Sequence, residues 1–344
     1  MGGVRLGGLV VLPTQYIPFV FGHFDSGIGF TVQRVGVLTA SPGQDPVNLS
    51  TETANSIQTP RLSPDGQWIL WTQAGQIRAI KTDGTGETQA WGLGSTGFAA
   101  ASNPNWKPDS SGIIFCTQPS SGTSPNIWEV PFDGTDQTGN ETSLYTDPSS
   151  RSITEAFYTY NGAHIVFSVE IGGGVTGIWS MTAAASGAAQ LDTQPVTGYN
   201  PLIPKFVLGK AHEWIAWNDN TTASPIWKRM DVDGTNVTTL ITFAAGYRSP
   251  YYDSWAPDDS VLYYARDTLR ELWSVTNDGA THTLVYDNGT VAFRESAWSF
   301  PQAPDRIYAA ENLVSGNYDI WSFLPDGSDQ RVEASDAVGH YTLV

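Results

Sequence analysis

Residues 62–71 read Leu-Ser-Pro-Asp-Gly-Gln-Trp-Ile-Leu-Trp, and residues 83–85 read Asp-Gly-Thr. A second copy of this pattern begins at residues 106–109, Trp-Lys-Pro-Asp, and ends at residues 133–135, again Asp-Gly-Thr. The pattern recurs at intervals of roughly 44 to 53 residues, a period that is typical of repeat architectures. The repeat therefore decides the fold. It does not name a function, because such folds host many unrelated activities.

Each copy of the repeat predicts four short strands. The first strand ends at a Pro-Asp turn, in which proline presets φ and the next position tolerates aspartate or glycine. A short apolar second strand follows, such as residues 113–116, Ile-Ile-Phe-Cys, and the third strand carries Ile-Trp, as at residues 127–128. An Asp-Gly turn then favours a hairpin to the fourth strand, because glycine accepts positive φ. Four-stranded units of this kind predict an all-β fold, a β-propeller.

The number of copies sets the expected domain organisation. Six clear repeats cover residues 58–334, and residues 1–57 are interpreted as a degenerate first blade whose first strand is residues 9–12. Residues 335–344 are expected to be a closing strand that pairs with the first blade, since closure protects strand edges. We therefore expect a single closed β-propeller domain over residues 1–344, with seven blades favoured. Six blades plus an N-terminal extension is the alternative.

Composition excludes several classes of partner. The net charge is −17 and the pI is about 4.5, which argues against nucleic-acid or anionic-membrane binding. The apolar run at residues 9–12 is stopped by Pro13; it is too short to cross a membrane and makes no convincing signal peptide. The single cysteine, Cys116, lies in an apolar strand and is expected to be a buried thiol.

The tryptophans recur at one phase of the repeat, where side chains pack between adjacent blades. Core packing is therefore expected for most of the 13 tryptophans. Trp91 lies outside the repeating phases and is the tryptophan for which exposure is most expected.

Residues 62–71, together with residues 231–236, Asp-Val-Asp-Gly-Thr-Asn, resemble the WD40-like PD40 repeat. That repeat forms the propeller of TolB and the propeller domains of prolyl oligopeptidase-type peptidases. The resemblance covers roughly residues 58–334 by repeat count and implies a TolB-like propeller fold. In TolB-like proteins the propeller is a protein-interaction platform, and in the peptidases it gates a separate hydrolase domain. The sequence departs from both, since it shows neither TolB's N-terminal domain nor a Gly-x-Ser-x-Gly nucleophile elbow.

The sequence offers little metal or cofactor chemistry. None of the five histidines forms a zinc-ligand spacing with another histidine or with the cysteine. Residues 231–236 resemble the start of a calcium loop, but the Glu that would complete it is missing and the segment coincides with a hairpin turn. We therefore expect no metal site and no cofactor.

Polar residues on or near the first strands are the candidates for a ligand site in the central channel. A ring of mixed charge there is able to bind a small polar ligand or an ion, and a merely hydrated channel is the alternative. The candidates are Arg61, Asn105, Glu155, Lys205, Asp253 and Glu295. Three of them, Glu155, Asp253 and Glu295, are carboxylates that would serve as acid and base if a glycan were bound.

The favoured function is a non-catalytic propeller, not an enzyme, that binds a protein partner or builds an assembly. A virion (a phage tail or surface) or an extracellular cell-surface assembly is the expected location, with other subunits as partners. The alternative is a hydrolase or lyase that acts on a glycan through the channel carboxylates. Irregular segments rich in Gly, Ser, Thr and Pro are the expected contact surfaces. They are Trp91–Asn103, Gln118–Pro125, Gln137–Arg151 and Gly187–Tyr199.

Overall fold

The computed structural model describes residues 16–24, 31–39, 47–49, 58–92, 101–117, 126–172, 175–192, 206–219, 224, 226–243, 254–266, 271–287, 293–300, 303–312, 318–336 and 339–343. All regular elements within these ranges are β-strands, so the all-β prediction is confirmed. No helix of the described residues is long and apolar enough to span a membrane.

The strands form seven four-stranded antiparallel sheets, in each of which neighbouring strands follow one another along the chain except at β28. We number the sheets in chain order and give their strands from the first to the fourth position. Sheet 1 contains β28 (Gly339–Leu343), β1 (Tyr16–Phe24), β2 (Thr31–Thr39) and β3 (Val47–Asn48), and sheet 2 contains β4 (Gln58–Leu62), β5 (Trp68–Gln73), β6 (Gln76–Lys81) and β7 (Thr88–Trp91). Sheet 3 contains β8 (Ala101–Trp106), β9 (Gly112–Thr117), β10 (Asn126–Pro131) and β11 (Thr142–Thr146), and sheet 4 contains β12 (Ile153–Tyr158), β13 (His164–Gly172), β14 (Val175–Thr182) and β15 (Ala189–Asp192). Sheet 5 contains β16 (Phe206–Leu208), β17 (Trp214–Asp219), β18 (Ile226–Asp231) and β19 (Thr238–Thr242); sheet 6 contains β20 (Ser254–Trp255), β21 (Val261–Arg266), β22 (Glu271–Thr276) and β23 (His282–Asp287); and sheet 7 contains β24 (Phe293–Phe300), β25 (Ala303–Asn312), β26 (Tyr318–Phe323) and β27 (Arg331–Asp336).

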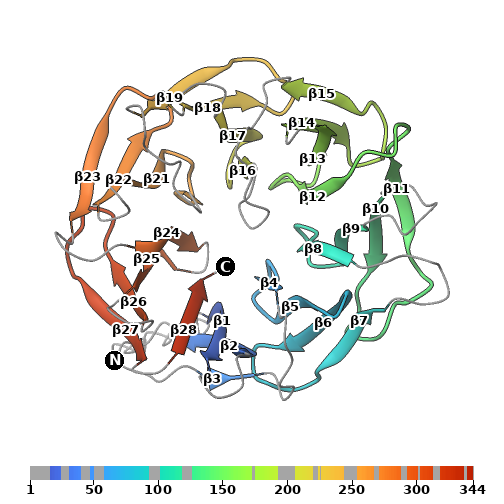
Figure 1. Cartoon of the computed structure of the whole chain (residues 1–344), viewed down its shortest axis with the longest axis horizontal. Coiled ribbons are helices and arrows are strands. Elements are labelled where there is room, and N and C mark those ends of the chain that lie inside the picture. Colours follow the sequence, from blue (N-terminus) through green and yellow to red (C-terminus); the bar gives the residue numbers. More distant parts are fainter. Residues whose placement is uncertain are drawn as a thin grey trace, which may run out of the picture.

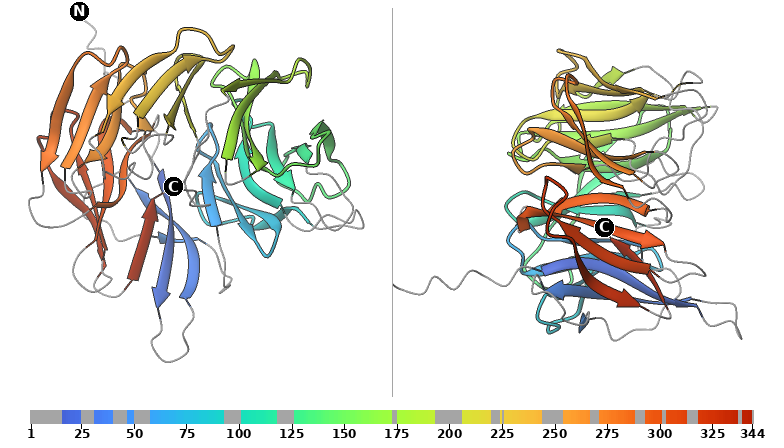
Figure 2. Two further views of the ribbon diagram at one scale, coloured as in Figure 1. Left: turned by 45° about the horizontal axis from the view of Figure 1, so that its top comes forward. Right: turned by 90° about the vertical axis from the view of Figure 1, so that its left-hand side faces the viewer.

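The sheets stand side by side around a common axis, with first strands such as β4, β8, β12 and β16 nearest to it (Figure 1). Seen from the side, the strands run between two opposite ends of the molecule (Figure 2). The turns from first to second strand and from third to fourth strand share one end, which we call the turn end. The second-to-third turns and the connections from one sheet to the next share the other, which we call the connection end. This division follows from the antiparallel order of the strands.

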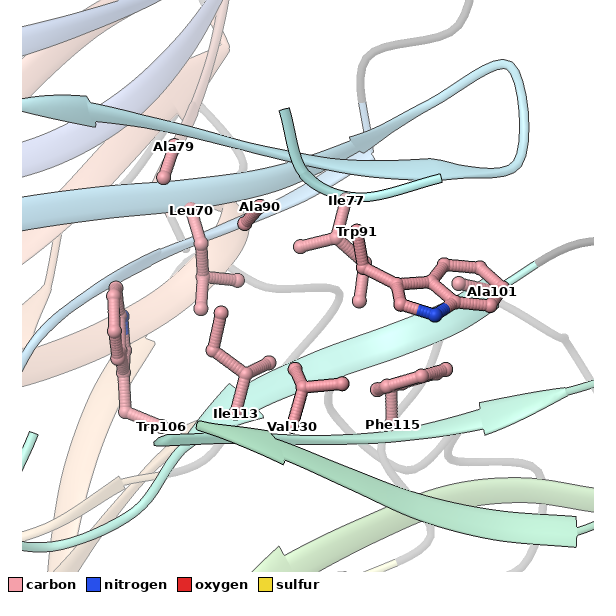
Figure 3. Close-up of a cluster of buried hydrophobic side chains, with 10 residues drawn as sticks. All are labelled: Leu70, Ile77, Ala79, Ala90, Trp91, Ala101, Trp106, Ile113, Phe115 and Val130. Carbon is pink, nitrogen blue, oxygen red and sulfur yellow. The ribbon is translucent and has the colours of Figure 1, made fainter. Parts of the chain in front are cut away.

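Neighbouring sheets bury one apolar cluster between each pair from sheet 2 to sheet 7. Between sheets 2 and 3, Leu70, Ile77 and Trp91 of one sheet meet Ile113 and Phe115 of the other (Figure 3). The second strand supplies the most buried positions because it is covered on both faces. In β9, for example, every residue is buried.

The recurring tryptophans belong to these clusters, which confirms their predicted core role. They are Trp128, Trp179, Trp227, Trp273 and Trp321. The pairing register shifts at the position of this residue, between the third and fourth strands of each of sheets 2 to 7. A bulge of this kind increases local twist, and twisted sheets pack face to face around an axis.

The expectation that Trp91 is exposed is wrong. Its side chain is only 1% exposed, and its ring centroid lies 4.7 Å from that of Phe115. Trp91 ends β7 and pairs with Ile77, and the matching positions in sheets 3 and 6 are held by Tyr145 and Tyr286. The Tyr145 ring likewise lies 4.9 Å from the ring of Phe167 in the next sheet, so this position of the fourth strand packs against the neighbouring sheet in more than one repeat.

The Asp-Gly turns at the turn end adopt the predicted positive φ, for example φ +73° at Gly279 and φ +80° at Gly327. At these two turns a second constraint acts, because the neighbouring sheet comes very close. A Cβ atom on Gly327 would lie 1.9 Å from the carbonyl oxygen of Val285, and one on Gly279 would lie 2.4 Å from that of Thr239. Glycine is therefore needed both for the turn and for contact between the sheets.

Sheet 1 combines the two ends of the sequence. The last strand, β28, occupies its first position and pairs antiparallel with β1 from Phe19↔Leu343 to His23↔Gly339. The pairing with the first blade is the one expected for the C-terminal strand, and its role in closing the ring stays a prediction. The strand expected over residues 9–12 lies outside the described residues.

Candidate functional site

The turns between first and second strands clasp successive sheets to one another at the turn end. Between sheets 2 and 3, the Asp65 amide donates to Ser110 Oγ at 3.1 Å. Between sheets 4 and 5, Glu213 accepts from Thr159 Oγ1 at 2.9 Å and lies 2.7 Å from His164 Nδ1. These bonds join residues about one repeat apart, so they link sheet 2 to sheet 3 and sheet 4 to sheet 5.

The strongest clasp joins sheets 5 and 6. Asp259 is fully buried and accepts three backbone N–H groups of the opposite turn: Lys210 at 2.7 Å, Ala211 at 2.8 Å and His212 at 2.7 Å. Successive backbone amides that converge in this way form an anion-binding nest, and here the anion is a side chain of the neighbouring sheet. Asp259 itself has φ +57°, a left-handed conformation that aspartate and asparagine tolerate better than most residues.

Three side chains stack beside this clasp. The His212 ring lies parallel to Trp214, with centroids 4.3 Å apart, and the Arg229 guanidinium lies 4.1 Å from the centroid of the same indole. Burial lowers the pKa of Lys210 to about 7, and the nearby Asp259 carboxylate opposes that shift only in part. The Trp214 indole thus contacts both His212 and Arg229, and each contact restricts the same ring.

The channel candidates fall into three groups. Arg61 on β4 and Asn105 on β8 meet directly, since Arg61 Nε donates to Asn105 Oδ1 at 3.2 Å. Asn105 is 6% exposed and also donates Nδ2 to the Ala156 carbonyl at 3.0 Å, so one amide ties together sheets 2, 3 and 4. Glu155 on β12 is also buried, and its charge raises the pKa of Cys116 as a smaller contribution after burial.

The remaining candidates cannot be placed beside these. Lys205 and Asp253 lie outside the described residues, and of Glu295 only the backbone, on β24, is described. The role of the six residues as a ligand site therefore stays a prediction. Among the described candidates, Arg61 on β4 and Asn105 on β8 form a hydrogen bond that links two first strands.

The described residues hold no group of three or more His, Cys, Asp or Glu side chains that could bind a metal ion. The thiol of Cys116 is buried, and burial raises its pKa, so this cysteine is protonated at neutral pH and a poor nucleophile.

The connection end carries most of the segments predicted as contact surfaces. The connection between β11 and β12, residues 147–152, is described throughout. The buried Asp147 carboxylate accepts from the Ser149 amide at 2.8 Å and forms an ion pair with Arg151 at 2.8 Å. The three residues between them, Pro148, Ser149 and Ser150, are exposed. Residues 93–100, 118–125 and 193–199 of the other predicted segments lie outside the described residues, and the strand ends that flank them lie at the same end.

Sequence reasoning missed the clasps formed by Glu213 and Asp259. Two consecutive aspartates, Asp258 and Asp259, follow Pro257 in the sequence. Asp258 is exposed and bonds within its own turn, whereas Asp259 is buried, and nothing in the local pattern distinguishes the two. The partner of Asp259 lies in the preceding repeat, and only the packing of the sheets brings the two together.

Comparison with solved structures supports a TolB-like PD40 propeller fold. A prolyl endopeptidase, from a study of two such enzymes, matches with a TM-score of 0.63 and 14% identity over 96% of this chain and 51% of its own length. The chain thus spans about half the length of that peptidase. A TolB-like protein from Agrobacterium tumefaciens matches with a TM-score of 0.50 and 13% identity, over 94% of this chain and 91% of that one.

TolB from Acinetobacter baumannii matches with a TM-score of 0.51 and 11% identity, over 94% of this chain and 81% of that one. Identities this low show a shared fold and not a shared activity. No family model matches the chain, and no curated protein matches it.

Proposed function

We propose that this chain is a non-catalytic β-propeller that binds a protein partner through its connection end, as one subunit of a virion or cell-surface assembly. The observation that carries the proposal is the difference between the two ends. The turn end is built from repeated, interlocked turns, whereas the connection end varies from sheet to sheet.

The uniformity of the turn end is visible in the strand bounds. The first-to-second turns of sheets 2 to 6 span residues 63–67, 107–111, 159–163, 209–213 and 256–260, which are equal in length. Several of them bond to the next sheet, so a change in one turn would disturb its neighbour. The turns at this end therefore hold neighbouring sheets together.

The connection end has no such uniformity. Connections between successive sheets run from residues 337–338, the shortest, to residues 193–205, the longest. Recognition is usually carried by variable loops on a rigid scaffold. The hydrogen bond and the ion pair of Asp147 show how a connection can be fixed while its exposed residues stay available to a partner. A loop that is ordered before binding loses less conformational entropy when a partner binds.

The charge and the resemblance to TolB-like repeats support the same proposal. A net charge of −17 favours a partner with a basic contact surface, because complementary charge speeds association. The resemblance implies a protein-interaction platform, which is the role of the propeller in that family.

The test is a pull-down from the native source with mass spectrometry, beside light scattering of the purified chain. Two matched variants locate the surface: Ser149→Arg at the connection end and Gln67→Arg at the turn end, both of which are exposed. We expect a stoichiometric partner that Ser149→Arg loses and Gln67→Arg keeps. A partner lost only with Gln67→Arg would contradict the assignment of the face, and the absence of any partner would contradict the proposal.

The alternative, a glycan hydrolase or lyase, depends on Glu155 acting with Asp253 or Glu295. Its test is glycan turnover by the purified chain and by Glu155→Gln. Turnover that the substitution abolishes, with unchanged thermal unfolding, would favour the enzyme over the binding module.

A further inference from the structure

The turn from first to second strand in sheet 4, residues 159–163, carries an exposed asparagine followed by glycine, Asn161–Gly162. The other Asn-Gly pair of the sequence, Asn288–Gly289, lies outside the described residues. A backbone nitrogen that follows asparagine can attack the carbon of the side-chain amide, and glycine hinders that attack least because it has no Cβ. In the described part of the chain, Asn161 is therefore the asparagine most open to this reaction.

Hydrogen bonds within the turn favour the reaction at Asn161. Its Oδ1 accepts from the Ala163 amide at 2.9 Å and from Thr159 Oγ1 at 3.1 Å. When Gly162 N attacks Cγ, negative charge develops on Oδ1, and donors that already point at this atom stabilise the charge. The Gly162 amide donates to the Thr159 carbonyl at 2.8 Å, so this bond must open before the attack. Opening costs little free energy at an exposed turn.

We propose that Asn161 deamidates without an enzyme, with water as the co-reactant, and that the product weakens the clasp between sheets 4 and 5. The bond from Gly162 N to Asn161 Cγ forms, the Cγ–Nδ2 bond breaks, and ammonia leaves with the proton of the Gly162 amide. Water then opens the five-membered imide at one of its two carbonyls. One opening gives aspartate, and the other gives isoaspartate, in which the main chain runs through the side-chain carbon. Neither step oxidises or reduces the chain.

The corresponding turn of sheet 2 shows what an aspartate does at this position. Asp65 is its third residue, and Asp65 Oδ1 accepts from the hydroxyl of the first residue, Ser63. In sheet 4 the first residue is Thr159, whose hydroxyl lies next to Asn161 in the same way. A carboxylate accepts more strongly than an amide oxygen, so an aspartate at position 161 is expected to take the Thr159 proton.

That proton also serves the contact between the sheets. Thr159 Oγ1 donates to Glu213 Oε1 of sheet 5 at 2.9 Å, and a hydroxyl has only one proton to donate. A second carboxylate beside Thr159 competes with Glu213 for this proton, which leaves Glu213 its contact with His164 Nδ1 at 2.7 Å. Deamidation is thus a slow, one-way change that loosens one interface at the turn end. It does not depend on the proposed partner, and each inference can fail while the other stands.

Peptide mass spectrometry of the purified chain measures the conversion. The chain is kept in a mildly alkaline buffer and sampled over days. Asn140 and Asn236 are internal controls, because both are exposed but neither is followed by glycine. We expect Asn161 to lose ammonia and become a mixture of aspartate and isoaspartate while the two controls remain amides. Conversion of Asn161 no faster than that of the controls would overturn the proposal.

The effect of the product is tested with Asn161→Asp, by hydrogen exchange of peptides that cover residues 209–214. A hydrogen bond to a charged group is lost, so we expect exchange at least about tenfold faster than in the unchanged chain. With Glu213→Gln as the starting point, the same substitution is expected to accelerate exchange only about threefold, since the bond lost there is not to a charge. Equal acceleration from both starting points, or none from Asn161→Asp alone, would show that the product does not act on the clasp.

Discussion

Replacing Asp259 by asparagine should release the clasp between sheets 5 and 6. Asparagine has nearly the same shape and also tolerates the positive φ of this position, so the backbone is not strained by the change. One of the two oxygens becomes an NH₂ group, which cannot accept from the amides that converge on the carboxylate. The substitution therefore tests the hydrogen bonds and the charge, not the turn.

The geometry sets the magnitude. Oδ1 accepts from Lys210, and Oδ2 accepts from Ala211 and His212. If the amide oxygen keeps the two bonds at Oδ2, the bond to Lys210 is lost and the other two no longer involve a charge. A hydrogen bond to a charged group contributes about 1.5–3 kcal/mol, so we expect a loss of about 2–4 kcal/mol in the opening free energy of this interface.

Hydrogen exchange with mass spectrometry measures that opening locally. Peptides that cover residues 209–214 should exchange about 30 to 900 times faster in the Asp259→Asn variant, the equivalent of that free energy. The rings of Trp214 and Trp255 lie 6.0 Å apart across the same interface, so a urea titration followed by tryptophan fluorescence gives an independent readout.

The matched control is Asp258→Asn, which removes the same charge one residue earlier. Asp258 is exposed and accepts from the amide and hydroxyl of Ser260, within its own turn. A surface change of this kind is expected to alter stability by less than about 1 kcal/mol. If both variants accelerate exchange of residues 209–214 equally, the clasp reasoning is refuted, since net charge would then explain the effect.

Three further predictions follow from the packing. Gly327→Ala should lower the melting temperature more than Gly187→Ala. Both glycines have positive φ, but only at Gly327 would an added Cβ collide with the neighbouring sheet, since no atom lies within 4 Å of a Cβ at Gly187. Equal shifts in melting temperature would exclude the contact between the sheets as the cause. Trp91→Ala should cost about 3–5 kcal/mol in urea unfolding because the residue is buried, and a change below about 1 kcal/mol would contradict its burial. Stability should rise as pH increases from about 7 towards 10. In that window the unfolded Lys210 binds a proton that the folded chain, with its lowered pKa, does not. Lys210→Met should flatten this part of a pH series of melting temperatures, and an unchanged slope would show that Lys210 is not its source.

Local chemistry explains why so much of the fold could be predicted. A Pro-Asp or Asp-Gly turn depends on the φ preferences of two or three residues, and an apolar run of four residues predicts a buried strand wherever it lies. The recurring tryptophans could be assigned to the core for the same reason, since their phase repeats. Trp91 was not assigned to the core, because its counterparts in sheets 3 and 6 are Tyr145 and Tyr286 and the recurrence of tryptophan does not mark this position.

The candidate site was less predictable, because it depends on contacts between repeats. Arg61 and Asn105 were chosen as ligand-binding residues from their place on the first strands, and their side chains meet each other across two sheets. No pattern within a single repeat distinguishes a side chain that faces a ligand from one that faces the next sheet.

By itself, the sequence determined the repeat, the four strands of each unit and the turns between them, because these depend on residues close together in the chain. The sequence also predicted that a C-terminal strand pairs with the first blade. Only the tertiary structure decided the position and register of β28 on β1, that Asp259 and not Asp258 is buried between two sheets, and that Trp91 is buried. Each of these depends on a segment in another repeat, and in the case of β28 on the opposite end of the sequence. The hydrophobic and hydrogen-bonding groups involved are ordinary ones, and only the packing of neighbouring sheets decides which of them are buried.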